Sequence, residues 1–327
     1  MRENIESFPG HILEALNIAK NITFNFEKKD IKNIVIAGQG GSAIGGFIVQ
    51  NIFNNKSKFP IYLNKNYKIP EYVNNNTLFI ASSYSGNTEE TLSALNFAYK
   101  KTKKIFCITS GGELLKLAKK NRYNFITIPG GSAPRSMVCF SIIQILYIVN
   151  YINNFSFNQL ESQLLDVNKF LIKHKSNIIN DATVIAKKLL DKIPIIYTFP
   201  EFEGVALRFK QQLNENSKMH SFYNIIPEMN HNEIVPWNKK ECNLIPIFIR
   251  GLSSKRNIDR MHINMNQIKK YVENFILIEG IGTYLNQYFY LINIVDWISL
   301  IFAERNNIDP NEIKAIESLK EELKLYK

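Results

Sequence analysis

Short runs of apolar, often β-branched residues alternate along the chain with longer segments whose apolar residues recur at helical spacing. In the first half, the predicted strands are Asn33–Gly38, Pro60–Leu63, Thr77–Ser82, Lys104–Thr109 and Asn124–Pro129. Helical patterns follow most of these strands. Because buried strands that alternate with helices form parallel sheets covered on both faces, we predict an α/β fold.

The same rhythm returns in the second half of the chain, after a mostly helical, Asn-rich connection. Its predicted strands are Ile193–Phe199, Ser221–Ile226, Leu244–Gly251 and Asn274–Gly280. We therefore predict two doubly wound parallel-sheet domains, each with three αβα layers, and a helix near the C-terminus. The predicted domains are residues 1–153 and 154–327. Functional sites in such folds lie at the carboxyl ends of the strands.

Composition and charge exclude several classes of protein. Hydrophobic residues make up 45% of the 327 residues and charged residues 21%, which is typical of a globular protein with a real core. The net charge of +11 could indicate a nucleic-acid partner. Lysine is spread along the chain, however, and the densest basic run, Lys100–Lys104, follows a helical pattern. We interpret that run as a solvated helix end and expect no nucleic-acid partner.

The sequence shows no sign of secretion or membrane insertion. The first ten residues contain Glu3 and lack the apolar stretch of a signal peptide. The long apolar segment 283–303 is interrupted by Asn286, Gln287, Asn293 and Asp296, so we predict a buried helix and not a membrane span. We expect a cytoplasmic protein.

Metal and disulfide sites are not expected either. The three cysteines, Cys107, Cys139 and Cys242, lie far apart and lack metal-ligand spacing. No cluster of His and Glu with metal spacing appears in the sequence. We therefore predict neither a metal nor a disulfide framework.

Two loops rich in glycine or hydroxyl groups each join a predicted strand to a predicted helix. The first, Gly38–Gly46, superficially fits a dinucleotide-binding fingerprint. That motif needs an acidic residue about 20 positions later to bind a ribose. The next strand ends at Asn64 instead, so a nicotinamide cofactor is disfavoured.

The second loop, within Ala81–Leu95, concentrates hydroxyl groups and carries no basic residue. Amides at a helix N-terminus and Ser or Thr hydroxyls can together bind a phosphate monoester without a lysine. The alternative is that one side chain only caps the helix, which needs a single hydroxyl. We favour phosphate binding by both loops, with the predicted contacts at Gly40, Gly41, Ser42, Ser83, Ser85 and Thr88.

These loops resemble those of sugar isomerase (SIS) domains. The stretches GGSAIGG, SYSGNTEET and GGSAPRSM occur in that order, and QLNENSK and PEMNHNEI follow downstream. Together they resemble the bifunctional phosphoglucose/phosphomannose isomerases, which belong to the phosphoglucose isomerase superfamily. The resemblance implies two SIS-type domains and an aldose–ketose isomerase that interconverts glucose 6-phosphate, and also mannose 6-phosphate, with fructose 6-phosphate through an enediolate. It implies no cofactor and a homodimer.

The resemblance also assigns catalytic roles. It makes Glu215 the carboxylate base that moves the proton between C1 and C2, and Arg135 the cation that stabilises the enediolate. It makes His231 the group that opens the sugar ring, contributed across the dimer interface to the partner's site. Lys320 would assist ring opening or stabilise the oxyanion, although Lys314 and Lys324 fit the same spacing.

One departure and two rival functions remain. Family members often have a threonine, linked to mannose stereochemistry, near the position where this chain has Asn311, which weakens the expectation of mannose 6-phosphate turnover. One rival is a non-catalytic sugar-phosphate sensor built on the same domain, which would not need Glu215 or His231. The other is an isomerase of an amino or pentose sugar phosphate.

Overall fold

A computed structural model describes residues 1–240 and 243–326 of the chain. In the described ranges, two parallel sheets account for all the strands. The first sheet has the order β2-β1-β3-β4-β5, and the second has the order β7-β6-β8-β9. The strands of the first sheet are β1 (Asn33–Ala37), β2 (Ile61–Asn64), β3 (Thr77–Ser82), β4 (Ile105–Thr109) and β5 (Asn124–Thr127). Those of the second are β6 (Ile193–Thr198), β7 (Phe222–Ile225), β8 (Leu244–Arg250) and β9 (Ile276–Glu279).

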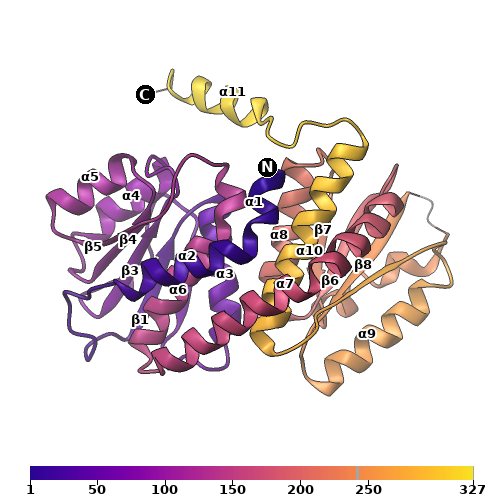
Figure 1. The fold of residues 1–327 in the computed structure, drawn as a ribbon, viewed down its shortest axis with the longest axis horizontal. Coiled ribbons are helices and arrows are strands. Elements are labelled where there is room, and N and C mark those ends of the chain that lie inside the picture. The colour runs from indigo at the N-terminus through magenta and orange to yellow at the C-terminus, as the bar shows by residue number, and fades with distance from the viewer. Residues whose placement is uncertain (241–242, 327) are drawn as a thin grey trace.

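Helices cover both faces of each sheet, as Figure 1 shows. The first half contains α1 (Arg2–Glu6), α2 (Phe8–Lys20), α3 (Gly40–Phe53), α4 (Glu89–Ala98), α5 (Gly112–Lys120) and α6 (Val138–Ile152). The second half contains α7 (Phe157–Lys188), α8 (Glu203–Glu215), α9 (Lys255–Ile268), α10 (Tyr284–Arg305) and α11 (Lys314–Leu323). Four 3₁₀ helices complete the described elements: η1 (Pro134–Met137), η2 (Pro200–Phe202), η3 (Glu228–His231) and η4 (Val235–Asn238). The predicted α/β fold with two parallel sheets is confirmed.

One hydrophobic core joins the two halves. It contains the inner face of each sheet together with residues of α2, α3, α6, α7, α8 and α10. Two smaller clusters lie on the outer faces, one under α4 and α5 and the other under α9. Packing between the halves therefore holds the carboxyl ends of both sheets in a fixed relationship. The predicted division at residue 153 falls in the turn between α6 and α7 and stays a prediction.

Two long apolar helices, α6 and α10, are buried inside the protein. Within the described residues, one helical stretch, Pro134–Ile152, is long and apolar enough to cross a membrane, but nearly all of it is buried inside the protein. It packs against α2 and α3. The predicted burial of α10 is confirmed, because nearly all of its residues are inaccessible to solvent. Cys107 and Cys139 are buried and free, and Cys242 lies outside the described residues.

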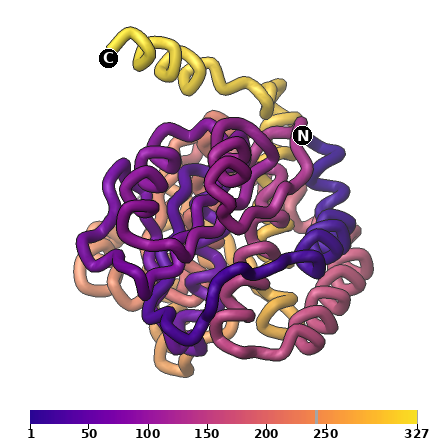
Figure 2. Tube along the Cα trace, turned by 90° about the vertical axis from the view of Figure 1, so that its left-hand side faces the viewer, coloured from indigo at the N-terminus to yellow at the C-terminus, as the bar shows by residue number. Residues whose placement is uncertain are grey.

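The C-terminal helix α11 stands apart from both domains. None of its residues is buried, and Figures 1 and 2 show it projecting beyond the rest of the molecule. The apolar side chains of Ile316, Leu319 and Leu323 are 39%, 58% and 48% exposed. The helix is therefore attached to the domains mainly through the segment that precedes it.

Candidate active site

Arg135 and Glu215 come from different halves of the chain, and their side chains are in direct contact. Arg135 lies in η1, directly after Pro134, and its side chain is only 6% exposed. Its Nη1 lies 3.2 Å from Oε2 of Glu215, the last residue of α8. The Glu215 side chain keeps 31% of its surface exposed, so its carboxylate remains open to a ligand.

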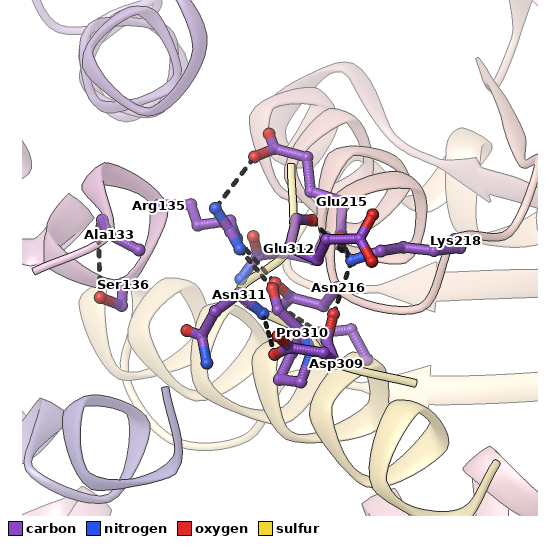
Figure 3. A network of polar contacts seen from close by, with 12 residues as sticks. Ala133, Arg135, Ser136, Glu215, Asn216, Lys218, Asp309, Pro310, Asn311 and Glu312 are labelled. Atoms are coloured by element: carbon purple, nitrogen blue, oxygen red, sulfur yellow. Dashed lines mark hydrogen bonds and ion pairs between the residues drawn. The ribbon is translucent and has the colours of Figure 1, made fainter. Parts of the chain in front are cut away.

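Three acceptors fix the guanidinium of Arg135, as Figure 3 shows. Besides Glu215, its Nε donates to Oδ1 of Asn216 at 2.7 Å, and its Nη2 donates to the carbonyl of Pro310. Burial lowers the pKa of Arg135, and the charge of Glu215 opposes that shift. Because an arginine starts from a very high pKa, the group remains a cation placed beside a carboxylate.

The asparagines on either side of Glu215 act on other groups. The sequence there reads Asn-Glu-Asn, a pattern that favours positioning of the carboxylate by the two neighbouring amides. In the structure Asn216 instead holds Arg135, and the Asn214 amide donates to the carbonyl of Met219 at 2.7 Å. Neither amide bonds the Glu215 carboxylate in the part of the chain that the structure describes.

A fully buried ion pair, Arg208–Asp296, contacts the backbone of Arg135. Arg208 of α8 lies 2.6 Å from Asp296 of α10, and both side chains are at most 3% exposed. The same Nη2 of Arg208 donates to the carbonyl of Arg135 at 2.9 Å, and Gln212 donates to Asp296. Burial raises the pKa of Asp296, while the bonds from Arg208 and Gln212 oppose that rise. The pair therefore ties η1 of the first half to two helices of the second.

The two predicted phosphate-binding loops lie against each other and against η1. The hydroxyl of Ser42 accepts a hydrogen bond from the amide of Tyr84 at 3.0 Å, which joins the first loop to the second. A Cβ on Gly41 would lie 3.1 Å from the carbonyl oxygen of Pro134, so glycine permits this close approach. Gly40, with a φ of +50°, opens α3 without a side-chain cap.

The hydroxyl groups of the second loop are only partly free. Ser83 is buried, and its Oγ lies 2.7 Å from Oγ1 of Thr88 and accepts from the Gly86 amide. Ser85 is exposed and accepts from the Asn87 amide at 3.2 Å. No side chain caps α4, whose N-cap residue is Thr88. The capping alternative therefore does not account for these hydroxyls.

His231 and Lys320 are exposed and take no part in the Arg135–Glu215 contact in the described residues. His231 is an exposed residue at the end of η3, beyond the carboxyl end of β7, and Lys320 is an exposed residue of α11. Within residues 1–240 and 243–326, neither side chain forms a hydrogen bond or an ion pair with Arg135 or Glu215. A single copy of the chain thus brings together two of the four predicted catalytic residues.

A hollow of about 550 Å³ lies elsewhere in the molecule. Its lining residues include Phe53 at the C-terminal end of α3, Leu146 in the C-terminal half of α6 and Tyr284 at the start of α10. Gly40 and Arg135 lie at the N-terminal ends of α3 and of the helical stretch that continues into α6, and a helix of 14 residues is about 20 Å long. The hollow is therefore separate from the candidate active site.

Known proteins resemble this chain along its whole length. The family model described as the bacterial phospho-glucose isomerase C-terminal SIS domain matches residues 178–323. A bifunctional phosphoglucose/phosphomannose isomerase of Caldicellulosiruptor bescii is 37% identical over 99% of this chain and 98% of its own. One of Aquifex aeolicus is 32% identical over 96% of this chain and 99% of its own. The chain belongs to the bifunctional phosphoglucose/phosphomannose isomerase family.

A solved structure with lower sequence identity has the same fold. The C-terminal domain of the glucosamine-fructose-6-phosphate aminotransferase from Francisella tularensis matches with a TM-score of 0.74 and 16% identity. The match covers 94% of this chain and 96% of that one. The expected pair of SIS-type domains is thus confirmed for this member of the bifunctional phosphoglucose/phosphomannose isomerase family.

The structure adds three residues to the site that the sequence pattern did not single out. Arg208 and Asp296 form the buried pair behind Arg135. Lys218 donates to the carbonyl of Glu215. A charged residue at an otherwise apolar helix position, as at Asp296 within α10, is the signal that could have indicated a buried partner. In this bifunctional isomerase the pair lies directly behind a predicted catalytic residue.

Proposed function

We propose that this protein is an aldose–ketose isomerase that interconverts glucose 6-phosphate, and also mannose 6-phosphate, with fructose 6-phosphate. The contact between Arg135 and Glu215 carries the proposal, because it places a fixed cation beside a solvent-accessible carboxylate. The reaction needs this combination: a base takes the proton from C2 of the open-chain aldose, and a cation stabilises the oxyanion that develops. The names of the similar relatives support the choice of substrates.

In this proposal the two loops beside η1 bind the phosphate of the sugar. Gly40 and Gly41 contribute backbone amides, and the exposed hydroxyl of Ser85 donates to a phosphate oxygen. Ser42, Ser83 and Thr88 contribute hydroxyls. Ser42 accepts from the Tyr84 amide and still has its own proton to donate, and the bond between Ser83 and Thr88 uses only one of their two protons. Gly41 lies against the backbone of Pro134 and Arg135. A phosphate bound at the Gly41 amide would therefore place the carbon chain of the sugar next to Arg135.

Glu215 then acts as the base in both directions. Its carboxylate removes the proton from C2, and the enediolate oxygen is stabilised by the guanidinium of Arg135. Glu215 returns the proton to C1 to give fructose 6-phosphate. The chain's own residues supply base and cation, so we propose a reaction without cofactor or metal.

We further propose that His231 and Lys320 complete the site. His231 would come from a second copy of the chain in a homodimer and open the sugar ring. This assignment is consistent with its exposed position at the end of η3. Lys320 would approach when α11 docks. The location in the cytoplasm and the lack of a nucleic-acid partner stay predictions.

A coupled assay on a panel of sugar phosphates tests the proposal. The purified protein, dialysed against a chelator, is given glucose 6-phosphate, mannose 6-phosphate, glucosamine 6-phosphate and a pentose 5-phosphate. We expect turnover of the first two, with retained activity in the chelator. Binding of fructose 6-phosphate without any conversion would favour the sensor, and turnover confined to the amino or pentose sugar would favour the other isomerase.

A further inference from the structure

Lys218 joins the end of α8 to the segment that leads into α11. Its Nζ donates to the carbonyl of Glu215 at 2.7 Å, to that of Asp309 at 2.8 Å and to that of Glu312 at 2.9 Å. An ammonium group has three hydrogens, so these acceptors use its full donor capacity. Figure 3 shows the three carbonyls grouped around this one side chain.

The backbone of Lys218 has a conformation that favours glycine. Its φ is +54°, and it occupies the turn after α8 in which the amide of Met219 donates to the carbonyl of Leu213 at 3.0 Å. A glycine commonly occupies the left-handed position of such a helix-ending turn, because a side chain there is sterically disfavoured. A lysine at this position indicates that its side chain does something that a glycine could not.

A simple helix cap does not account for the contacts. A lysine near a helix C-terminus often bonds the last carbonyls of its own helix, and the bond to Glu215 is of this kind. The carbonyls of Asp309 and Glu312, however, belong to a segment more than 90 residues further along the chain. Arg135 bonds Pro310 in that same segment. The two cations thus hold the segment from both sides.

We propose that Lys218 is a positioning residue for the isomerase reaction. It fixes the end of α8, and with it the carboxylate of Glu215, relative to the segment 309–312 that Arg135 also holds. It also anchors the segment that leads into α11. The catalytic part of this inference rests on the proposed function of Glu215, whereas the anchoring of the segment does not.

The test compares Lys218→Gly and Lys218→Arg with the wild-type protein. Glycine suits the backbone, so Lys218→Gly is expected to keep its melting temperature. Because misplacing a catalytic group by about 1 Å can cost about 10²-fold, we expect kcat to fall about 10²-fold while KM for glucose 6-phosphate stays within about threefold. Lys218→Arg, which keeps the charge and several donors, is expected to recover part of the lost kcat.

Limited proteolysis measures the anchoring without any substrate. Glu-C cleavage after Glu312, followed by mass spectrometry, is expected to be at least about fivefold faster in Lys218→Gly, because local opening exposes that bond. The matched control is Arg122→Gly. Arg122 is an exposed basic residue with a φ of +56° in the turn after α5. This control should leave both kcat and cleavage unchanged.

Each outcome decides the inference. Slower turnover with unchanged melting temperature and faster cleavage supports it. Wild-type kcat in Lys218→Gly, or a fall in kcat matched by a lower melting temperature, overturns the positioning role. If the wild-type protein converts neither sugar phosphate, the proposed function fails, and the cleavage rate alone still decides whether Lys218 anchors the segment.

Discussion

The guanidinium of Arg135 and the carboxylate of Glu215 lie 3.2 Å apart although 80 residues separate them in the chain. One comes from a short 3₁₀ helix after the first sheet, and the other ends a helix of the second half. The core that joins the two halves holds both elements in place. A cation and a base are therefore positioned before substrate arrives, which reduces the reorganisation that the reaction requires.

Replacing Glu215 by glutamine should nearly abolish isomerisation. The amide has almost the same shape and still can bond Arg135, but it cannot accept a proton from C2. Loss of a general base costs about 10²–10⁴-fold in rate, so kcat for glucose 6-phosphate should fall by that amount. Calorimetric titration should show fructose 6-phosphate binding within about threefold of wild type, because the phosphate loops are unchanged. Retained kcat would remove Glu215 from the mechanism.

Replacing Arg135 by lysine should also be strongly deleterious, although the charge is kept. A lysine cannot reach Glu215, Asn216 and the carbonyl of Pro310 with one planar group, as the guanidinium does. We expect kcat to fall about 10²–10³-fold, as when an oxyanion-stabilising donor is lost. Steady-state kinetics of Arg135→Lys beside Arg122→Lys, an exposed control, measure the effect. Equal kcat values for the two variants would contradict it.

Mixing two inactive variants tests whether His231 acts across a dimer interface. If the site takes Glu215 from one copy and His231 from the other, a heterodimer of Glu215→Gln and His231→Ala chains has one intact site. Random pairing makes half of the dimers mixed, so co-expression should restore about a quarter of wild-type activity. Each variant expressed alone is the control. No recovery in a preparation shown to contain mixed dimers would place His231 in its own chain's site or outside any site.

Removing one member of the buried pair behind Arg135 should destabilise the fold. In Asp296→Ala, Arg208 remains buried without its carboxylate, and such a change costs about 3–5 kcal/mol. Urea denaturation measures the free energy of unfolding. The double variant Arg208→Met/Asp296→Leu removes both charges and should lose less than Asp296→Ala alone. A larger loss in the double variant would show that packing, and not the unpaired charge, dominates.

The elements of the fold follow closely from the hydrophobic pattern, and the differences have local causes. The strand Thr77–Ser82 has the predicted bounds, because all six of its residues are buried and five of them are apolar or β-branched. The helical pattern of the sequence predicts a helix over Asp259–Val272. Helix α9 instead begins four residues earlier, at Lys255, because the hydroxyl of Ser254 caps it by accepting from the Asn257 amide. The first turn of that helix contains polar residues, so the apolar spacing in the sequence does not show where the helix begins.

The site could be predicted only in part. Motif order indicated Arg135 and Glu215, and the structure joins them. Sequence spacing could not show that Asn216 would bond Arg135 instead of Glu215, since that depends on the direction in which α8 ends. It also could not place Lys320, because the position of α11 depends on what the exposed helix contacts and not on its own periodicity.

Isomerisation in D₂O tests the enediolate mechanism most directly. Wild-type protein, dialysed against a chelator, is incubated with fructose 6-phosphate, and the products are analysed by NMR. The account predicts glucose 6-phosphate and mannose 6-phosphate that carry solvent deuterium at C2, because Glu215 holds the transferred proton where it can exchange. The absence of aldose products, or aldoses with no deuterium at C2, would contradict it.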